Sequence, residues 1–188
     1  MKHYAIRSSL KNKLLASFLF VGVLPSFLLG FFVYSALVQN IERSVKQTYT
    51  TELAGTCEFL EDSVRKAAQQ AQTVPKQEAR SLLKALPFVQ DVRETGALQE
   101  DMTAIEKQVQ GNRMQLVLDM PYLNKIFSRN LEGRGTAAIT DGSEPLENKK
   151  DSEDFIICSA PLFQGELSVI QYIDRQVVLH DVIFWGDL

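Results

Sequence analysis

LLASFLFVGVLPSFLLGFFVYSALV, residues 14–38, is an uncharged and mostly apolar stretch that decides how the rest of the chain is organised. As a helix it rises roughly 37 Å, which exceeds the hydrocarbon thickness of a bilayer, about 30 Å. The stretch therefore predicts a transmembrane helix. A cleaved signal peptide is the alternative, but its apolar region covers only about 7 to 15 residues and ends at small side chains. Val33-Tyr34-Ser35 is a poor cleavage site of that kind.

Charge is distributed unevenly on the two sides of this stretch. Residues 1–13 carry no acidic side chain and four basic ones: Lys2, Arg7, Lys11 and Lys13. Because the cytoplasmic flanks of membrane helices are enriched in Lys and Arg, residues 1–13 are predicted to be cytoplasmic. Residues 39–188 are then extracytoplasmic, in a single-pass protein of the cell membrane. They hold 16 of the 20 basic residues and all 23 acidic ones, so their net charge of −7 argues against nucleic acid as a partner.

Small residues recur at every fourth position inside the stretch, at Gly22, Ser26 and Gly30. They fall on one face of a helix, where small side chains let two helices approach closely. Two interpretations stay open: the face is the contact of a homodimer, or it reflects the general abundance of small residues in membrane helices. Pro25 is expected to kink the helix between them.

A helical period continues beyond residue 38 with almost no interruption. Its apolar positions recur at spacings near three, four or seven and are Ile41, Val45, Tyr49, Leu53, Leu60, Val64, Ala67 and Ala71. Charged residues occupy the other faces, so the pattern predicts one long amphipathic helix that emerges from the membrane. Pro75 ends this helix, and the residues from Lys76 predict a shorter one that Pro87 closes. Residues 39–87 therefore form a helical, membrane-proximal region.

Strand signals dominate residues 88–178. Residues 88–94 predict a short strand, and residues 113–120 predict another that is followed by a helix beginning near Pro121. Residues 97–110 are ambiguous between a helix and a loop with a helical piece, because their apolar positions are sparse.

Three further strands are predicted toward the end of the chain. Residues 136–140 lead into Asp141-Gly142, a dipeptide typical of hairpins. DFIICSAPLF (154–163) and ELSVIQYIDRQVV (166–178) predict two strands that Gln164-Gly165 joins as an antiparallel pair. Short connections between strands imply an antiparallel sheet, and the predicted fold class is α+β.

Four segments carry a family resemblance: residues 7–38, MQLVLDMPYLNKIFSR (114–129), GTAAITDGS (135–143) and FIICSAPLFQGELSVIQYID (155–174). Together they resemble the extracytoplasmic sensor region of bacterial transmembrane receptors with a PAS-like Cache domain, especially the sensor histidine kinases of two-component systems. The resemblance implies a long helix that leads into a PAS-like antiparallel sheet flanked by helices. It also implies a small-molecule pocket between the sheet and the segments that cover it.

The same resemblance implies that ligand contacts come from the central strands, the helix after LVLDM and the last strand. The matching positions are Arg113, Asp119, Tyr122, Tyr172 and Asp174. An Arg would hold a ligand carboxylate, an Asp would hold an ammonium group, and the tyrosines would stack on the ligand and offer a hydroxyl. The alternative for Arg113 and Asp119 is that they are exposed strand ends, and for Tyr172 that it is ordinary core.

Catalytic and metal-binding motifs are not found in the sequence. No nucleophile stands in a framing motif, and residues 151–154 lack the spacing of a calcium loop. The only histidines, His3 and His180, do not form a metal-binding pattern. We therefore expect neither an enzyme nor a cofactor or metal. The only cysteines, Cys57 and Cys158, leave a disulfide and two buried free thiols as open alternatives.

The end of the chain departs from the receptor pattern, in which a second membrane helix and signalling domains follow the last strand. Residues 179–188 form a tail whose apolar run, between Asp181 and Asp187, is too short to cross a membrane. We expect a fragment or truncated form of a receptor; a stand-alone anchored protein that signals through a partner kinase is the alternative.

Two functions stay open on the sequence alone. The first is a signal-input module that binds a small molecule outside the membrane and transmits a conformational change through residues 14–38. The second is a membrane-anchored interaction or structural protein of the cell envelope that has no small-molecule ligand.

Overall fold

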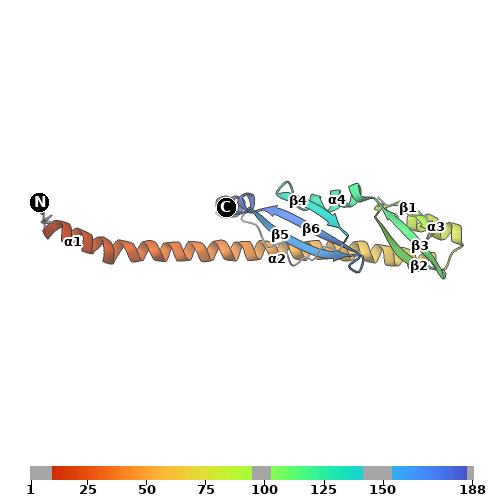
Figure 1. Ribbon diagram of the computed structural model, residues 1–188, viewed down its shortest axis with the longest axis horizontal. Helices are drawn as coiled ribbons and strands as arrows, with labels where there is room; N and C mark the ends of the chain where they lie inside the picture. Colours follow the sequence, from red (N-terminus) through yellow and green to blue (C-terminus); the bar gives the residue numbers. More distant parts are fainter. Residues whose placement is uncertain (1–9, 95–102, 142–153, 186–188) are drawn as a thin grey trace, which may run out of the picture. The chain divides into compact units, whose positions relative to one another are not determined.

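The computed structural model describes residues 10–94, 103–141 and 154–185, and it divides into two compact units between Arg43 and Ser44. The first unit is helical in its described part and holds α1 (Leu10–Phe18), the π-helical turn η1 (Leu19–Val23) and the first part of α2 (Leu24–Ala71). The second unit holds the rest of α2 together with all other elements (Figure 1). This mixture of helices and antiparallel strands confirms the predicted α+β class.

The π-helical turn ends at Val23, two residues before Pro25. The N–H group of Leu24 donates a hydrogen bond to the carbonyl of Leu19, five residues earlier. Proline has no N–H group, and in an α-helix its ring clashes with the carbonyl four residues before it. A wider turn at this point accommodates the ring, so Pro25 distorts the helix locally without ending it.

The helical segment from Lys11 to Ala71 is long and apolar enough to cross a membrane. Its most apolar window has a mean hydropathy of 2.2 and no buried residue. Ser26 donates a hydrogen bond of 3.0 Å to the carbonyl of Gly22. A Cβ atom added at Gly22 or Gly30 would meet nothing within 4 Å, so the small-residue face is open in one chain. Its role in a homodimer stays a prediction.

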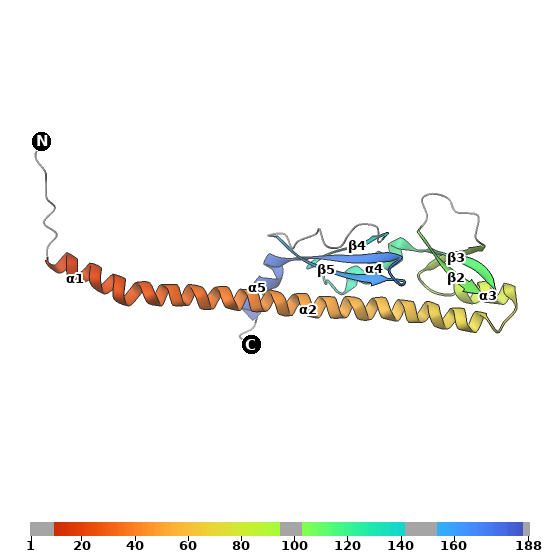
Figure 2. The same cartoon turned by 60° about the horizontal axis from the view of Figure 1, so that its bottom comes forward.

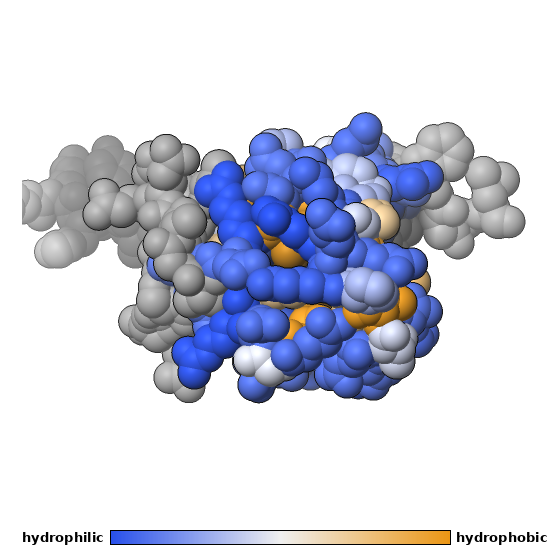
Figure 3. Space-filling model, turned by 90° about the vertical axis from the view of Figure 1, so that its right-hand side faces the viewer, coloured by the Kyte–Doolittle hydropathy of each residue, from blue (hydrophilic) through white to orange (hydrophobic). Residues whose placement is uncertain are grey.

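In the second unit, α2 is amphipathic as predicted. Its buried residues recur at helical spacing and are Leu53, Cys57, Leu60, Val64, Ala67 and Ala71. The predicted second helix is α3 (Lys76–Lys84), which follows Pro75 and buries Ala79 and Leu83. The end of this unit formed by α3 and the neighbouring sheet is largely hydrophilic, with small hydrophobic spots (Figure 3).

The strands form two small antiparallel sheets, whereas the sequence implied a single one. Sheet A has the order β1-β3-β2, with β1 at Val89–Glu94, β2 at Ala104–Val109 and β3 at Asn112–Leu118. Sheet B has the order β4-β6-β5, with β4 at Gly135–Thr140, β5 at Phe155–Leu162 and β6 at Leu167–Asp174. The predicted helix at Pro121 is α4 (Met120–Arg129), between the two sheets in the sequence. Figure 2 shows sheet B and sheet A following one another along α2 within the second unit.

The prediction of helix or loop for residues 97–110 is wrong where the structure describes them, because residues 104–109 are strand β2. Ile105 and Val109 are buried on one face, with Lys107 between them, which is the two-residue period of a strand. Gln110 and Gly111 have φ angles of 52° and 78°, and they connect the paired residues Val109 and Asn112. Two positive φ angles in a two-residue loop are typical of the tight turns that join antiparallel strands. Residues 97–102 lie outside the described residues.

The hairpin predicted at Asp141-Gly142 is also wrong. Strands β4 and β5 both pair with β6, so they run along its two edges and not against each other. The dipeptide signal was local, whereas the partner of β4 comes from more than twenty residues later. Gly142 itself, and the connection through residue 153, lie outside the described residues.

The last strand ends earlier than predicted. Strand β6 stops at Asp174, and residues 175–178 begin α5 (Arg175–Trp185). The Asp174 carboxylate accepts hydrogen bonds from the N–H groups of Gln176 (2.9 Å) and Val177 (3.1 Å). These bonds satisfy donors of the first helical turn, which is why the chain turns from strand to helix at this residue. The predicted tail therefore continues a helix.

Candidate functional site

Both sheets pack against α2 through one hydrophobic core in the second unit. Residues of β3, β5 and β6 share this core with the buried face of α2. On sheet B, the residues on the α2 side include Cys158 of β5, whose thiol donates a hydrogen bond to the Lys46 carbonyl at 3.7 Å. On sheet A, Gln110 donates side-chain hydrogen bonds to the carbonyls of Ala71 (2.8 Å) and Val74. The part of α2 in the second unit therefore contacts both sheets.

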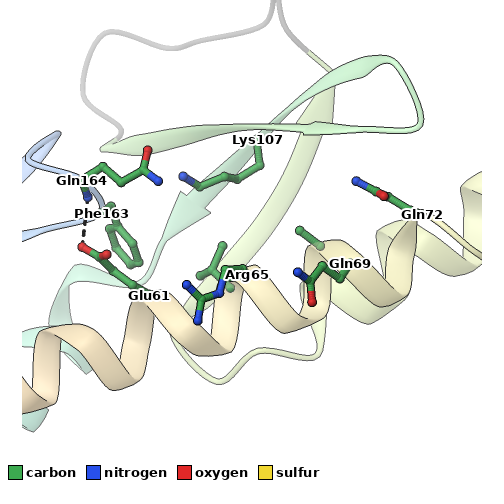
Figure 4. Close-up of a pocket in the computed structure, with 9 residues that line it drawn as sticks. Glu61, Arg65, Gln69, Gln72, Lys107, Phe163 and Gln164 are labelled. Carbon is green, nitrogen blue, oxygen red and sulfur yellow. Dashed lines mark hydrogen bonds between the residues drawn. The ribbon is translucent and has the colours of Figure 1, made fainter.

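A groove opens on α2 between the two sheets and encloses about 250 Å³. Its walls come from three elements: α2, strand β2 and the turn between β5 and β6 (Figure 4). The floor is apolar and consists of Val64, Ala68 and Phe163. The rim is polar and consists of Glu61, Arg65, Gln69, Gln72, Lys107 and Gln164.

The turn that closes one end of the groove has an unusual backbone. Phe163, Gln164 and Gly165 have φ angles of 54°, 61° and 87°, a region that favours glycine over other residues. One Glu61 carboxylate oxygen accepts a hydrogen bond of 2.9 Å from the N–H group of Gln164. Phe163 is only 1% exposed, so its ring is anchored in the core below the groove. These two contacts fix the turn to α2.

Charges on the α2 wall are mostly paired. Arg65 forms an ion pair with Asp62, which Lys66 contacts as well, at 2.8 Å. Hydrogen bonding by Lys66, joined by the charges of both cations, lowers the pKa of Asp62. The side chain of Arg65 is 70% exposed, so this pair contributes little to stability.

Lys107 differs from these paired charges. It lies in the same strand phase as Ile105 and Val109, so it extends from edge strand β2 over the groove toward Gln164 (Figure 4). Its ammonium group forms no hydrogen bond or ion pair among the described residues, whereas its backbone pairs with Met114 of β3. An inward-pointing charge on an edge strand also discourages pairing with another chain. Lys107 was not among the predicted site residues, because its position over the groove depends on residues 104–109 forming a strand.

The structure gives two of the predicted ligand residues a role at helix ends. Asp119 precedes α4, and its carboxylate accepts a hydrogen bond of 3.0 Å from the N–H group of Tyr122. Asp174 caps α5 in the same manner. Tyr122 itself is 37% exposed in the first turn of α4. The capping contacts account for both aspartates without a ligand.

The five predicted residues are not brought together. Arg113 is exposed beside the Gln110-Gly111 turn, and Asp119 follows the opposite end of β3, roughly 20 Å away at the rise of an antiparallel strand. Tyr172 is half-buried on sheet B and pairs with Ile157 and Thr136. None of the five lines the groove on α2. Their part in binding stays a prediction that the arrangement does not favour.

The two cysteines and the possible metal ligands can be described for residues 10–94, 103–141 and 154–185. Cys57 and Cys158 are both buried and neither is in a disulfide, so the structure has two buried thiols in place of a bridge. Burial, helped by the negative charge of Glu61, raises the pKa of Cys57 to about 12. No group of three or more His, Cys, Asp or Glu side chains is placed to hold a metal ion within residues 10–94, 103–141 and 154–185.

The groove has the composition of a binding site for a small molecule. Ligand sites in proteins are commonly apolar hollows with a few polar groups that fix the orientation of the ligand. No family model, curated protein or solved structure matches this chain. A function is therefore inferred from the sequence, the fold and this groove.

Proposed function

We propose that the chain is a membrane-anchored signal-input module that binds a small molecule outside the membrane. The observation that carries the proposal is that α2 has two properties at once. Its residues 61–69 line one wall of the groove, and it is the last and longest part of the helical segment Lys11–Ala71, which is long and apolar enough to span a membrane. Residues 1–13 are then cytoplasmic and residues 39–188 extracytoplasmic, as the excess of basic residues before the span favours.

In this proposal the module has two conformations, and the ligand makes better contacts in one of them than in the other. A ligand in the groove touches α2, β2 and the turn from Phe163 to Glu166. If these elements are spaced differently in two states, the ligand shifts the population toward the state that it fits better. The shift reaches the membrane because α2 is uninterrupted from Leu24 to Ala71.

The finer assignment to a Cache-type, PAS-like sensor of a histidine kinase belongs to the same proposal. Two features support it: the long helix is followed in the chain by antiparallel sheets, and residues 88–174 have the expected order of strands and helix. A homodimer through Gly22, Ser26 and Gly30 would give the helix a partner against which to move. The output would come from cytoplasmic signalling domains or from a partner kinase.

The test uses the full chain in lipid nanodiscs and a library of small metabolites. Thermal unfolding identifies compounds that stabilise the wild type, and hydrogen exchange then reports residues 24–43 with and without each compound. Ala68→Trp fills the groove, and Ala54→Trp, on the exposed face of α2, is the matched control.

The proposal expects at least one compound that stabilises the wild type and Ala54→Trp but not Ala68→Trp, and that changes exchange in residues 24–43. A library without any stabilising compound contradicts ligand sensing. Equal stabilisation of both variants places binding elsewhere, and unchanged exchange in residues 24–43 contradicts transmission.

One observation favours the alternative of an anchored interaction or structural protein. Phe59 is 70% exposed on α2, beside Gly55, where an added Cβ would meet nothing within 4 Å. An exposed aromatic ring next to a small residue suits a contact with another helix. This alternative predicts that a photo-crosslinker at Phe59 captures protein in cells, and that the library gives no stabilising compound.

A further inference from the structure

The groove on α2 is lined by one cation, Lys107, that no carboxylate of the described residues pairs with. Glu61 uses a carboxylate oxygen on the N–H group of Gln164, and Arg65 is held by Asp62. The Lys107 ammonium group, in contrast, has no hydrogen bond or ion pair among the described residues, and this residue is half-buried over the groove. An ammonium group without an ion-pair partner at a groove favours an anionic ligand, because a charge-assisted hydrogen bond can form there.

Three of the hydrogen-bonding side chains on the rim are neutral amides. The side chains of Gln69, Gln72 and Gln164 line the rim and form no hydrogen bond among the described residues. Figure 4 shows the Lys107 amine and the Gln164 amide extending toward each other over the groove. Amide N–H groups can donate to a carboxylate whose charge the lysine balances.

The charge of the ligand is limited by Glu61. This carboxylate lies on the same rim, so a doubly charged phosphate would meet one free cation and a like charge. A single carboxylate carries half of that charge, so Glu61 repels it less while Lys107 still attracts it. The floor of Val64, Ala68 and Phe163 offers apolar contact to the rest of the ligand.

We propose that the groove binds a small monocarboxylate with an apolar body. The proposal rests on the proposed function for the location of the ligand and adds its chemical class. The Lys107 ammonium group donates to the carboxylate, the amides of the rim complete its hydrogen bonds, and the apolar body lies on the floor. This site is separate from the five residues that the family resemblance implied.

Isothermal titration of the full chain in nanodiscs tests the class with three probes of the same aromatic body: benzoate, benzylamine and phenyl phosphate. Benzoate is expected to bind best. Lys107→Met removes one charge-assisted hydrogen bond, so affinity for benzoate should fall by about tenfold to a hundredfold. Lys107→Arg should retain most of it, and Lys125→Met, an exposed lysine on α4 outside the groove, should change nothing.

The remaining outcomes distinguish a failure of the monocarboxylate site from a failure of the proposed function. Stronger binding of benzylamine or phenyl phosphate, or benzoate binding that Lys107→Met leaves unchanged, overturns the monocarboxylate. So does the absence of binding by all three probes. If library compounds of another class still act through the groove, the signal-input function stands. If benzoate binds through Lys107 but exchange in residues 24–43 stays constant, the site stands and the function fails.

Discussion

Arg134 and Asp181 lie 47 residues apart in the sequence, yet the Arg134 Nε donates a hydrogen bond of 3.0 Å to the Asp181 Oδ2. Hydrogen bonding with Tyr49 of α2, together with the charge of Asp181, raises the pKa of Arg134. One guanidinium group thus connects α2, the segment before β4, and α5. The N-terminal and C-terminal helices of the second unit are joined through this side chain.

Arg134→Met should loosen α5 more than it lowers global stability. Arg134 and Asp181 are 38% and 37% exposed, so the ion pair itself contributes only about 0–1 kcal/mol. Loss of the tether should instead raise amide hydrogen exchange in residues 175–185, and high salt should raise it in the wild type as well. Arg129→Met, at the exposed end of α4, is the control. Equal exchange in α5 for both variants would contradict the tether.

Two glycines with free space around them should respond to alanine in opposite directions. Gly111 has a φ angle of 78°, so Gly111→Ala should lower the free energy of unfolding by about 1–2 kcal/mol through backbone strain alone. Gly55 lies within α2 with nothing within 4 Å of an added Cβ, and Gly55→Ala should raise it by about 0.8–1 kcal/mol. Denaturant unfolding of the full chain in detergent measures both. A tolerated Gly111→Ala would contradict the turn that defines β2.

Substitutions at Asp119 distinguish a helix cap from a ligand contact. Asp119→Ala should cost about 1 kcal/mol of stability, and Asp119→Asn or Asp119→Ser should restore most of it, because each can accept the hydrogen bond from the Tyr122 N–H group. Thermal unfolding without ligand measures the cap. If Asp119→Asn instead leaves stability intact but abolishes binding of a stabilising compound, the ligand role predicted from the resemblance is restored.

Cys57 should make the protein sensitive to alkali. Its pKa rises from an ordinary value of 9.0 to about 12 in the folded protein, so the unfolded chain loses this proton first. Stability from the protonated thiol is fully present below pH 9 and is lost as pH rises toward 12, with a slope of about 1.4 kcal/mol per pH unit. Urea unfolding of the wild type and Cys57→Ala across this range isolates the effect, since other groups titrate in both. Parallel pH curves would exclude it.

Periodic signals in the sequence predicted the helices and most strands. The spacing from Leu53 to Ala71 predicted the buried face of α2, and Pro121 marked the start of α4. Strand β2 was missed because its turn, Gln110-Gly111, is not among the strongest hairpin dipeptides and its inward face includes Lys107. The signal was present in the alternation of Ile105, Lys107 and Val109.

Pairing between distant strands could not be predicted from local signals. Asp141-Gly142 suggested a hairpin between β4 and the next strand, but β4 pairs with β6. The pairing depends on how the apolar faces of these strands are buried together in the core, which a local signal does not contain. The groove could not be predicted from the sequence for the same reason. Glu61, Lys107 and Gln164 are far apart in the sequence, and only the packing of β2 and the last turn on α2 makes them neighbours.

Because both native thiols are buried, the native protein is a suitable background for site-directed labelling. Cys57 and Cys158 are 3% and 1% exposed, and a thiol with a pKa near 12 holds almost no reactive thiolate at neutral pH. Maleimide or nitroxide reagents should therefore leave the folded wild type unmodified. Single cysteines introduced on the exposed face of α2 can report distances and motion without removal of the native ones.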